Sequence, residues 1–169
     1  MADVFRFRTA GADDRDAFLD MSREFYASDA VLHDVDPAFH EKAFAELLRS
    51  GTYLTCYIFT CGNQTAGYAL LSKMFSREFG GMVVWIEEAY VRPAFQGRGV
   101  GGTFFRWLRE NVPAAAYRLE VEPSNVRARR LYARLGFSEL PYVQMVIRGE
   151  GGASRLCGKN LRFFDGSIG

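Results

Sequence analysis

A glycine-rich stretch, Val91 to Gly102 (VRPAFQGRGVGG), contains the residues in this sequence best suited to binding chemistry. It places four glycines, two arginines and a glutamine within twelve residues, directly after the apolar run MVVWIEEAYV. Glycines leave backbone N–H groups bare and close together, which favours an anion. A helix is predicted to begin near Gly99, so its unpaired N–H groups and positive dipole end would meet the same anion. We therefore expect a phosphate-bearing ligand at this loop.

Two phosphate-binding patterns compete for this stretch. The glycines at 97, 99 and 102 satisfy G-x-G-x-x-G, and acidic residues follow roughly 20 positions later, as in a dinucleotide-binding fingerprint. Against that reading, residues 92–96 separate the strand from the first glycine, and the strand carries Glu87 and Glu88. Too little chain follows for a doubly wound domain. A Walker loop is excluded because no Gly-Lys-Ser/Thr follows, and a turn without a ligand would not explain four glycines.

Two consecutive carboxylates, Glu87 and Glu88, lie in the middle of this otherwise apolar strand. Carboxylates in such a strand are costly unless one or both face a polar cavity. Successive side chains of a regular strand point to opposite faces, so we expect Glu87 on the face of Trp85 and Ala89, with Glu88 on the other. A structural salt bridge is the competing explanation, and Glu88 is the better candidate for it.

The elements that must position these residues follow from the hydrophobic periodicity. Strands are predicted over 5–9, 52–60, 65–74, 82–91, 116–122 and 142–148, and helices over 12–28, 37–50, 100–111 and 124–136. Ser124 is expected to cap the last helix. The order β α α β β β α β α β predicts an α/β domain around a mixed sheet. We expect it to span residues 1–148 and the glycine-rich tail, 149–169, to be a mobile appendage.

Composition limits the range of functions. The chain has 169 residues, of which 49% are hydrophobic and 24% charged, with a formal net charge of +1. That balance gives no reason to expect nucleic acid or a membrane surface as partner, and a cytoplasmic protein is expected. The three cysteines and two histidines show no metal-ligand spacing, so we expect no metal and reduced, structural thiols. The cysteines are Cys56, Cys61 and Cys157, and the histidines are His33 and His40.

Two motifs together resemble the GCN5-related N-acetyltransferase (GNAT) family. QGRGVG fits the Gln/Arg-x-x-Gly-x-Gly/Ala pattern of that family's acetyl-CoA loop, and NVRARRLYARLGF follows at the family's spacing. The predicted element order is also the family's. The resemblance implies a single-domain fold with a mixed, mostly antiparallel sheet whose central strands splay apart. The acidic pair before the loop locally resembles the polyamine and diamine acetyltransferases.

The resemblance assigns the cofactor residues by position. The pantetheine arm of acetyl-CoA would pair with the backbone of Ala89, Tyr90 and Val91. The pyrophosphate would lie on the amides of Gln96, Gly97, Arg98, Gly99, Val100, Gly101 and Gly102. Asn125 would contact the cofactor arm, with Ala128 in the same motif. Among the basic residues of the last helix, Arg127 or Arg130 could reach the ribose phosphate.

The same resemblance suggests catalytic and acceptor residues. Tyr132 would lie near the thioester sulfur and donate a proton to the departing thiolate, although a plain core tyrosine is the alternative. Glu87 would bind or deprotonate the acceptor amine, directly or through water, beside Glu88. The segment between the first two helices is expected to line the acceptor site with Phe25, Tyr26, Asp29, Asp34 and Asp36.

These expectations combine into an N-acetyltransferase that moves an acetyl group from acetyl-CoA to a small cationic amine. No residue resembles a covalent nucleophile, so direct transfer in a ternary complex is expected. A non-catalytic acyl-CoA sensor and, more distantly, an NAD-binding oxidoreductase are the alternatives. A homodimer is implied by the resemblance alone, and the sequence does not select the amine.

Overall fold

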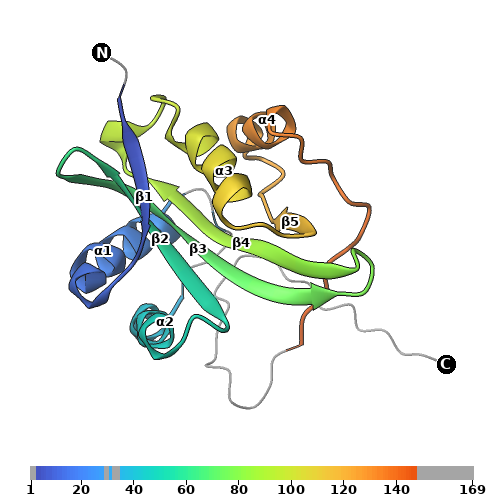
Figure 1. Ribbon diagram of the computed structural model, residues 1–169, viewed down its shortest axis with the longest axis horizontal. Helices are drawn as coiled ribbons and strands as arrows, with labels where there is room; N and C mark the ends of the chain where they lie inside the picture. The colour runs from blue at the N-terminus through green and yellow to red at the C-terminus, as the bar shows by residue number, and fades with distance from the viewer. Residues whose placement is uncertain (1–2, 29–30, 32–34, 148–169) are drawn as a thin grey trace.

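A five-stranded sheet runs through the molecule in the order β1-β2-β3-β4-β5 (Figure 1). The structure is a computed structural model and describes residues 3–28, 31 and 35–147. The first four strands pair antiparallel, and β5 pairs parallel with β4. The strands are β1 (Phe5–Thr9), β2 (Leu54–Cys61), β3 (Gln64–Ser76), β4 (Gly81–Val91) and β5 (Ala116–Leu119). This mixed sheet confirms the predicted fold class and differs from the parallel sheet of a doubly wound domain.

Helices cover both faces of the sheet (Figure 1). One face carries α1 (Arg15–Tyr26) and α2 (Pro37–Arg49), and the other carries α3 (Val100–Asn111) and α4 (Val126–Arg134). Two short 3-10 helices, η1 (Ala12–Asp14) and η2 (Pro93–Phe95), precede α1 and the glycine-rich loop. The predicted helices and the first five predicted strands are therefore present.

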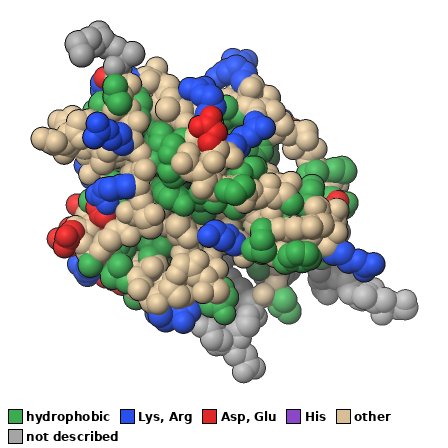
Figure 2. All heavy atoms as spheres, in the orientation of Figure 1, with side chains coloured by type: hydrophobic (Ala, Val, Ile, Leu, Met, Phe, Trp, Pro, Cys, Tyr) green, Lys and Arg blue, Asp and Glu red, His purple; other side chains and the backbone are tan. Residues whose placement is uncertain are grey.

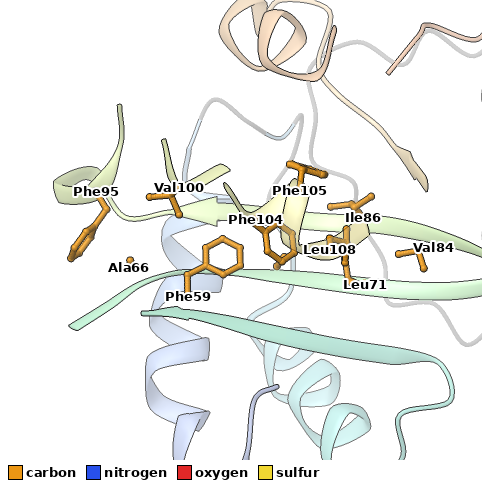
Figure 3. Close-up of a cluster of buried hydrophobic side chains, with 11 residues drawn as sticks. Phe59, Ala66, Leu71, Val84, Ile86, Phe95, Val100, Phe104, Phe105 and Leu108 are labelled. Atoms are coloured by element: carbon orange, nitrogen blue, oxygen red, sulfur yellow. The ribbon is translucent and has the colours of Figure 1, made fainter. Parts of the chain in front are cut away.

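Each face of the sheet has its own apolar core. Phe104 and Leu108, one helical turn apart on α3, pack with Phe59, Leu71 and Ile86 from the sheet (Figure 3). On the opposite face, side chains of α1 and α2 pack against β2 and β3. That second cluster includes Phe18, Met21, Phe44, Ile58 and Tyr68. The sheet is thus buried on both faces, which explains why β3 and β4 are apolar almost without interruption.

Helix starts follow the local sequence. The Asp36 side chain accepts a hydrogen bond from Ala38 N (2.9 Å), and Pro37 supplies a first residue that needs no N–H partner. At α4 the predicted cap was wrong by one residue. Asn125, and not Ser124, caps the helix by accepting from Ala128 N across 3.0 Å. Both residue types are good caps, so the sequence alone did not separate them.

The predicted strand over 142–148 is absent from its described part, 142–147, which is irregular. Residues 142–147 are apolar except for Gln144, yet Val143 is 87% exposed, Met145 94% and Ile147 95%. A strand requires a neighbouring edge that accepts its backbone hydrogen bonds, and this segment pairs with none of the described strands. The expected appendage, 149–169, lies outside the described residues.

Candidate active site

A β-bulge on β4 positions the two carboxylates. Leu70 of β3 lies opposite Glu88, but the next residue, Leu71, lies opposite Ile86, so Glu87 is the extra residue on β4. A bulge breaks the alternation of side chains. Ile86 and Ala89 both belong to the core under α3, whereas a regular strand would put them on opposite faces.

The prediction that Glu87 and Glu88 face opposite sides is therefore wrong. The Glu87 carboxylate accepts a hydrogen bond from Ser72 Oγ (2.5 Å), and Ser72 alternates with Leu71 and so lies on the α1 and α2 face. Glu88 reaches Tyr68 on that same face. The bulge thus turns two consecutive carboxylates toward one side of the sheet.

Glu88 is held in a buried network of hydroxyl groups. It is 8% exposed; its Oε1 accepts from Tyr26 OH (3.0 Å) and its Oε2 from Tyr68 OH. Tyr68 also has a hydrogen bond with Ser22, whose Oγ lies 2.8 Å from Nδ1 of His40. The salt bridge that was the competing explanation for Glu88 is absent among the described residues, because two phenols satisfy the carboxylate instead.

Burial dominates the electrostatics of this network. It raises the pKa of Glu88, although the hydrogen bonds from Tyr68 and Tyr26 act in the opposite direction. The neighbouring Glu87 raises it further through like-charge repulsion. Burial and the Glu88 carboxylate also raise the pKa of both phenols. Tyr26 and Tyr68 therefore remain protonated donors at neutral pH.

Beside this network lies a broad cavity of about 1730 Å³. Its wall includes Phe25 and Tyr26 of α1, Glu87 of β4 and Tyr132 of α4, so the structure brings together four of the predicted catalytic and acceptor residues. Glu88 is not part of the wall and lies behind Tyr26. It was expected beside the acceptor, and it meets the cavity only through that phenol.

Tyr132 packs in an aromatic cluster with Phe105 and Phe137, at ring-centroid distances of 5.6 Å and 5.7 Å. This packing fits the plain-core alternative for the ring, while the same residue also lines the cavity. Burial raises the pKa of Tyr132, so its hydroxyl keeps the proton. A protonated phenol at a cavity wall can donate a hydrogen bond or a proton to a nearby anion.

The end of β4 has a free edge. Pairing with β5 stops at Ile86, whereas β4 continues to Val91. The Arg92 N–H donates to Ala66 O on the β3 side (2.9 Å). The backbone N–H and C=O groups of successive strand residues point to opposite edges, so those of Ala89 and Val91 point to the open edge. Tyr90, by the same alternation, directs its backbone at β3. The predicted splay is present, but only two of the three predicted backbone residues face it.

The glycine-rich loop follows this edge. Gly97 and Gly99 have φ values of 78° and 83°, a left-handed conformation that suits glycine. Gly99 caps α3, so the N–H groups of Val100, Gly101 and Gly102 have no partner within the helix. The Gln96 side chain donates to Val91 O (2.9 Å) and fixes the loop to the strand. The loop therefore has the glycine conformations and the free N–H groups at a helix start that the sequence predicted.

Two arginines, Arg98 and Arg127, lie near the loop and differ in their engagement. Arg98 pairs with Asp3 (2.5 Å) and lies over the Phe95 ring at 5.1 Å, so its charge is already engaged. Arg127 is better placed than Arg98 to add a positive charge at the loop. Its Nη2 lies 4.0 Å from the position of a Cβ added to Gly97. Basic side chains gather over α4 in Figure 2. Arg127 and Arg130 were the two alternatives predicted to reach the ribose phosphate.

Several site residues had no sequence signal. Ser72, Trp85, Tyr68 and Ser22 read as ordinary strand or helix residues, and only the bulge and the packing of α1 bring them beside the carboxylates. Among the predicted acceptor acids, Asp36 caps α2. Asp29 and Asp34 lie outside the described residues.

Within the described residues, no helix is long and apolar enough to cross a membrane. The same residues contain no group of three or more His, Cys, Asp or Glu side chains arranged to hold a metal ion.

Comparisons with known proteins agree with this geometry. Residues 16–137 match the model of the acetyltransferase (GNAT) family. The chain is 27% identical over 168 residues to the thialysine N-epsilon-acetyltransferase of Mus musculus. The alignment covers 89% of this chain and 95% of that relative.

Solved structures show the same fold. A possible acetyltransferase from Clostridium difficile 630 has a TM-score of 0.72 at 19% identity, covering 86% of this chain and 98% of that chain. The aminoglycoside N-acetyltransferase AAC(6')-Iy, in complex with a bisubstrate analogue, has a TM-score of 0.69 at 18% identity, covering 86% and 99% of the two chains.

Proposed function

Because the chain belongs to the acetyltransferase (GNAT) family, we propose that it transfers an acetyl group from acetyl-CoA to the primary amine of a small cationic acceptor. The observation that carries the proposal is that Glu87 and Tyr132, from different elements, line one cavity beside the open edge of β4. A carboxylate for the amine and a protonated phenol for the leaving group are thus on the same cavity wall.

Acetyl-CoA is the acetyl donor in this proposal. Its pyrophosphate would bind the N–H groups of Gly97 to Gly102 at the start of α3, and its arm would pair with Ala89 and Val91. Arg127 adds a positive charge beside Gly97. The Asn125 side-chain carbonyl caps α4, which leaves its NH₂ group for the cofactor arm.

The chemistry requires a proton acceptor and a proton donor. A primary amine resembling that of lysine has a pKa near ~10.4 and arrives as an ammonium ion. Glu87 would attract this ion and accept its proton, directly or through water, so that the neutral amine attacks the thioester. Tyr132 would donate a proton to the departing thiolate, and direct transfer requires no covalent enzyme intermediate.

The relatives support an amine acceptor without selecting one. The mouse relative is named for thialysine and the solved relative for aminoglycosides, and both compounds carry primary amines. Phe25, Tyr26 and Glu87 offer an aromatic and acidic wall of the kind that suits such cations.

We also propose a homodimer. The segment 140–147 is mostly apolar and exposed, and β5 is an edge strand that pairs only with β4 among the described strands. A second copy would supply the missing edge for this segment. Light scattering of the full chain tests the proposal, and a monomer at all concentrations would contradict it.

Ligand-induced stabilisation tests the donor. Acetyl-CoA or CoA at about 100 times its dissociation constant should add roughly 2.7 kcal/mol to the free energy of unfolding, whereas NAD should add none. No rise with either CoA species would mean that the loop binds another ligand.

Turnover then separates an enzyme from a sensor. Thiol release with an amine panel should fall by about 10²- to 10⁴-fold in Glu87→Gln and in Tyr132→Phe, while both variants still bind acetyl-CoA. Binding without turnover of any amine by the wild type would favour a non-catalytic acyl-CoA sensor.

A further inference from the structure

Arg118 of β5 lines the same cavity as Glu87, and it has no carboxylate partner among the described residues. Its guanidinium lies over the Trp85 ring, 4.7 Å from the centroid, and the two residues are register partners across β4 and β5. Over residues 3–28, 31 and 35–147, Arg118 makes no ion pair. Arg118 is half-buried, and because no described carboxylate occupies its donors, its guanidinium is available to a ligand.

The same face of the sheet carries the Glu87 carboxylate. Trp85 lies between Val84 and Ile86 in the chain, and those two residues face the α3 core, so Trp85 faces the side of α1 and α2. Ser72, the register partner of Trp85 on β3, holds Glu87 on that side. Glu87 and Arg118 therefore lie on the same face as Trp85, and all three line the cavity.

This pair of opposite charges suits a zwitterionic ligand, in a cavity that is also lined by Glu120 and Glu122. An ammonium group near Glu87 is stabilised, whereas a second ammonium beside the Arg118 guanidinium would meet a like charge. A carboxylate would pair with the guanidinium, which offers a planar fork of donors.

The other arginines of the cavity are less suited to this role. Arg129 is paired with Glu139, Arg106 donates to Thr103, and Arg109 is exposed on α3. Arg118 is the cavity arginine that stands on the sheet beside Trp85.

We propose that Arg118 binds the carboxylate of an amino-acid acceptor whose side-chain amine is acetylated at Glu87; this inference rests on the proposed function. In the transfer the N–C(acetyl) bond forms and the C–S bond breaks. Of the three ammonium protons, one stays on the amide, one ends on the CoA thiol and one is released to water. Arg118 selects the acceptor and takes no part in these bond changes.

Lysine and 1,5-diaminopentane are the matched probes, because they share the reacting amine and the chain length and differ by the carboxylate. We expect the wild type to prefer lysine in kcat/KM, and Arg118→Gln to lose about 10- to 100-fold with lysine but little with the diamine. Arg118→Glu should reverse the preference and gain activity with the diamine, a result that misfolding cannot produce. Arg109→Gln, a charge loss in the same cavity, should leave the preference unchanged.

Calorimetric titration of lysine into the CoA complex separates this inference from the proposed function. Lysine binding that is weakened in Arg118→Gln and retained in Arg109→Gln supports the carboxylate site even where no turnover is found. Three results would each overturn the inference. The first is an equal loss of lysine and diamine turnover in Arg118→Gln, and the second is an unchanged lysine-to-diamine ratio in Arg118→Glu. The third is no binding of lysine to the wild type.

Discussion

The hydroxyl of Tyr26 donates a hydrogen bond to Oε1 of Glu88 across 3.0 Å, while Tyr68 donates to the other oxygen of the same carboxylate. The two phenols differ in their exposure. Tyr26 lines the cavity, whereas Tyr68 is fully buried under α1. They therefore offer a matched pair for separating acceptor binding from the stability of the buried network.

Removing either hydroxyl should have a different effect. Tyr68→Phe leaves a buried carboxylate oxygen with one donor fewer, so its free energy of unfolding should fall by about 1–3 kcal/mol. Tyr26→Phe should cost less stability, because water in the cavity can replace the phenol, and should raise the acceptor KM several-fold. Urea denaturation and steady-state kinetics measure the two effects, and the same KM in both variants would contradict the assignment.

The pKa of Glu88 predicts a pH dependence of stability. Burial raises this pKa above its usual value of 4.5, so the folded protein binds the proton more tightly than the unfolded chain. The free energy of unfolding should therefore fall as pH rises from about 4.5 through the folded-state pKa, by about 1.4 kcal/mol for each unit of pKa shift. Glu88→Gln lacks this loss and should gain stability relative to wild type over the same range.

Urea titrations of both proteins between about pH 4.5 and pH 8 measure that difference. The pKa of Asp14 is lowered by Arg8, so its stabilisation is lost as pH falls, but this effect is common to both proteins and cancels. A stability difference that stays constant with pH would show that Glu88 titrates normally in the folded protein.

The sequence predicted those parts of the site that follow from local patterns and from regular hydrophobic periodicity. The glycine-rich loop and the helix after it follow from local patterns, and the structure has both. The faces of Glu87 and Glu88 were predicted wrongly, because an extra residue in a strand leaves no mark in an apolar run. The strand over 142–148 was wrong in its described part for a related reason: a run rich in β-branched and aromatic residues predicts that a segment can pair, but not that an edge is available for it.

Gly67 allows the backbones of β3 and β4 to approach closely, and hydrophobic periodicity did not predict this approach. A Cβ at this position would lie 2.2 Å from Tyr90 O and 3.0 Å from Val91 Cα. Both contacts are with backbone atoms, so β3 and β4 would have to separate at the end of β4, where its other edge is open. Gly67→Ala should lower the free energy of unfolding by about 1–3 kcal/mol or more.

Gly51→Ala is the control for that substitution, because nothing lies within 4 Å of its added Cβ. It should change stability by less than about 0.5 kcal/mol. Thermal and urea unfolding of the two variants test the prediction. If Gly67→Ala were as stable as Gly51→Ala, the separation of β3 and β4 would have to be larger than described.

Gly99, at the start of α3, tests whether the loop binds a phosphate. Its φ of 83° strains any other residue, by roughly 1–2 kcal/mol, although no atom lies within 4 Å of an added Cβ. Gly62, in the β2–β3 turn, has a φ of 58° and equally open surroundings. Gly99→Ala and Gly62→Ala should therefore lose similar stability without ligand.

Acetyl-CoA should distinguish the two variants. In Gly99→Ala the added methyl group stands where the phosphate would approach the N–H groups of Val100 and Gly101, so the dissociation constant of acetyl-CoA should rise by at least about tenfold, a loss of about 1.4 kcal/mol. In Gly62→Ala, whose strain is similar but distant from the loop, acetyl-CoA should stabilise the protein as it does the wild type. Equal stabilisation of both variants by acetyl-CoA would move the phosphate away from the start of α3 and leave the positive φ of Gly99 as a requirement of the turn alone.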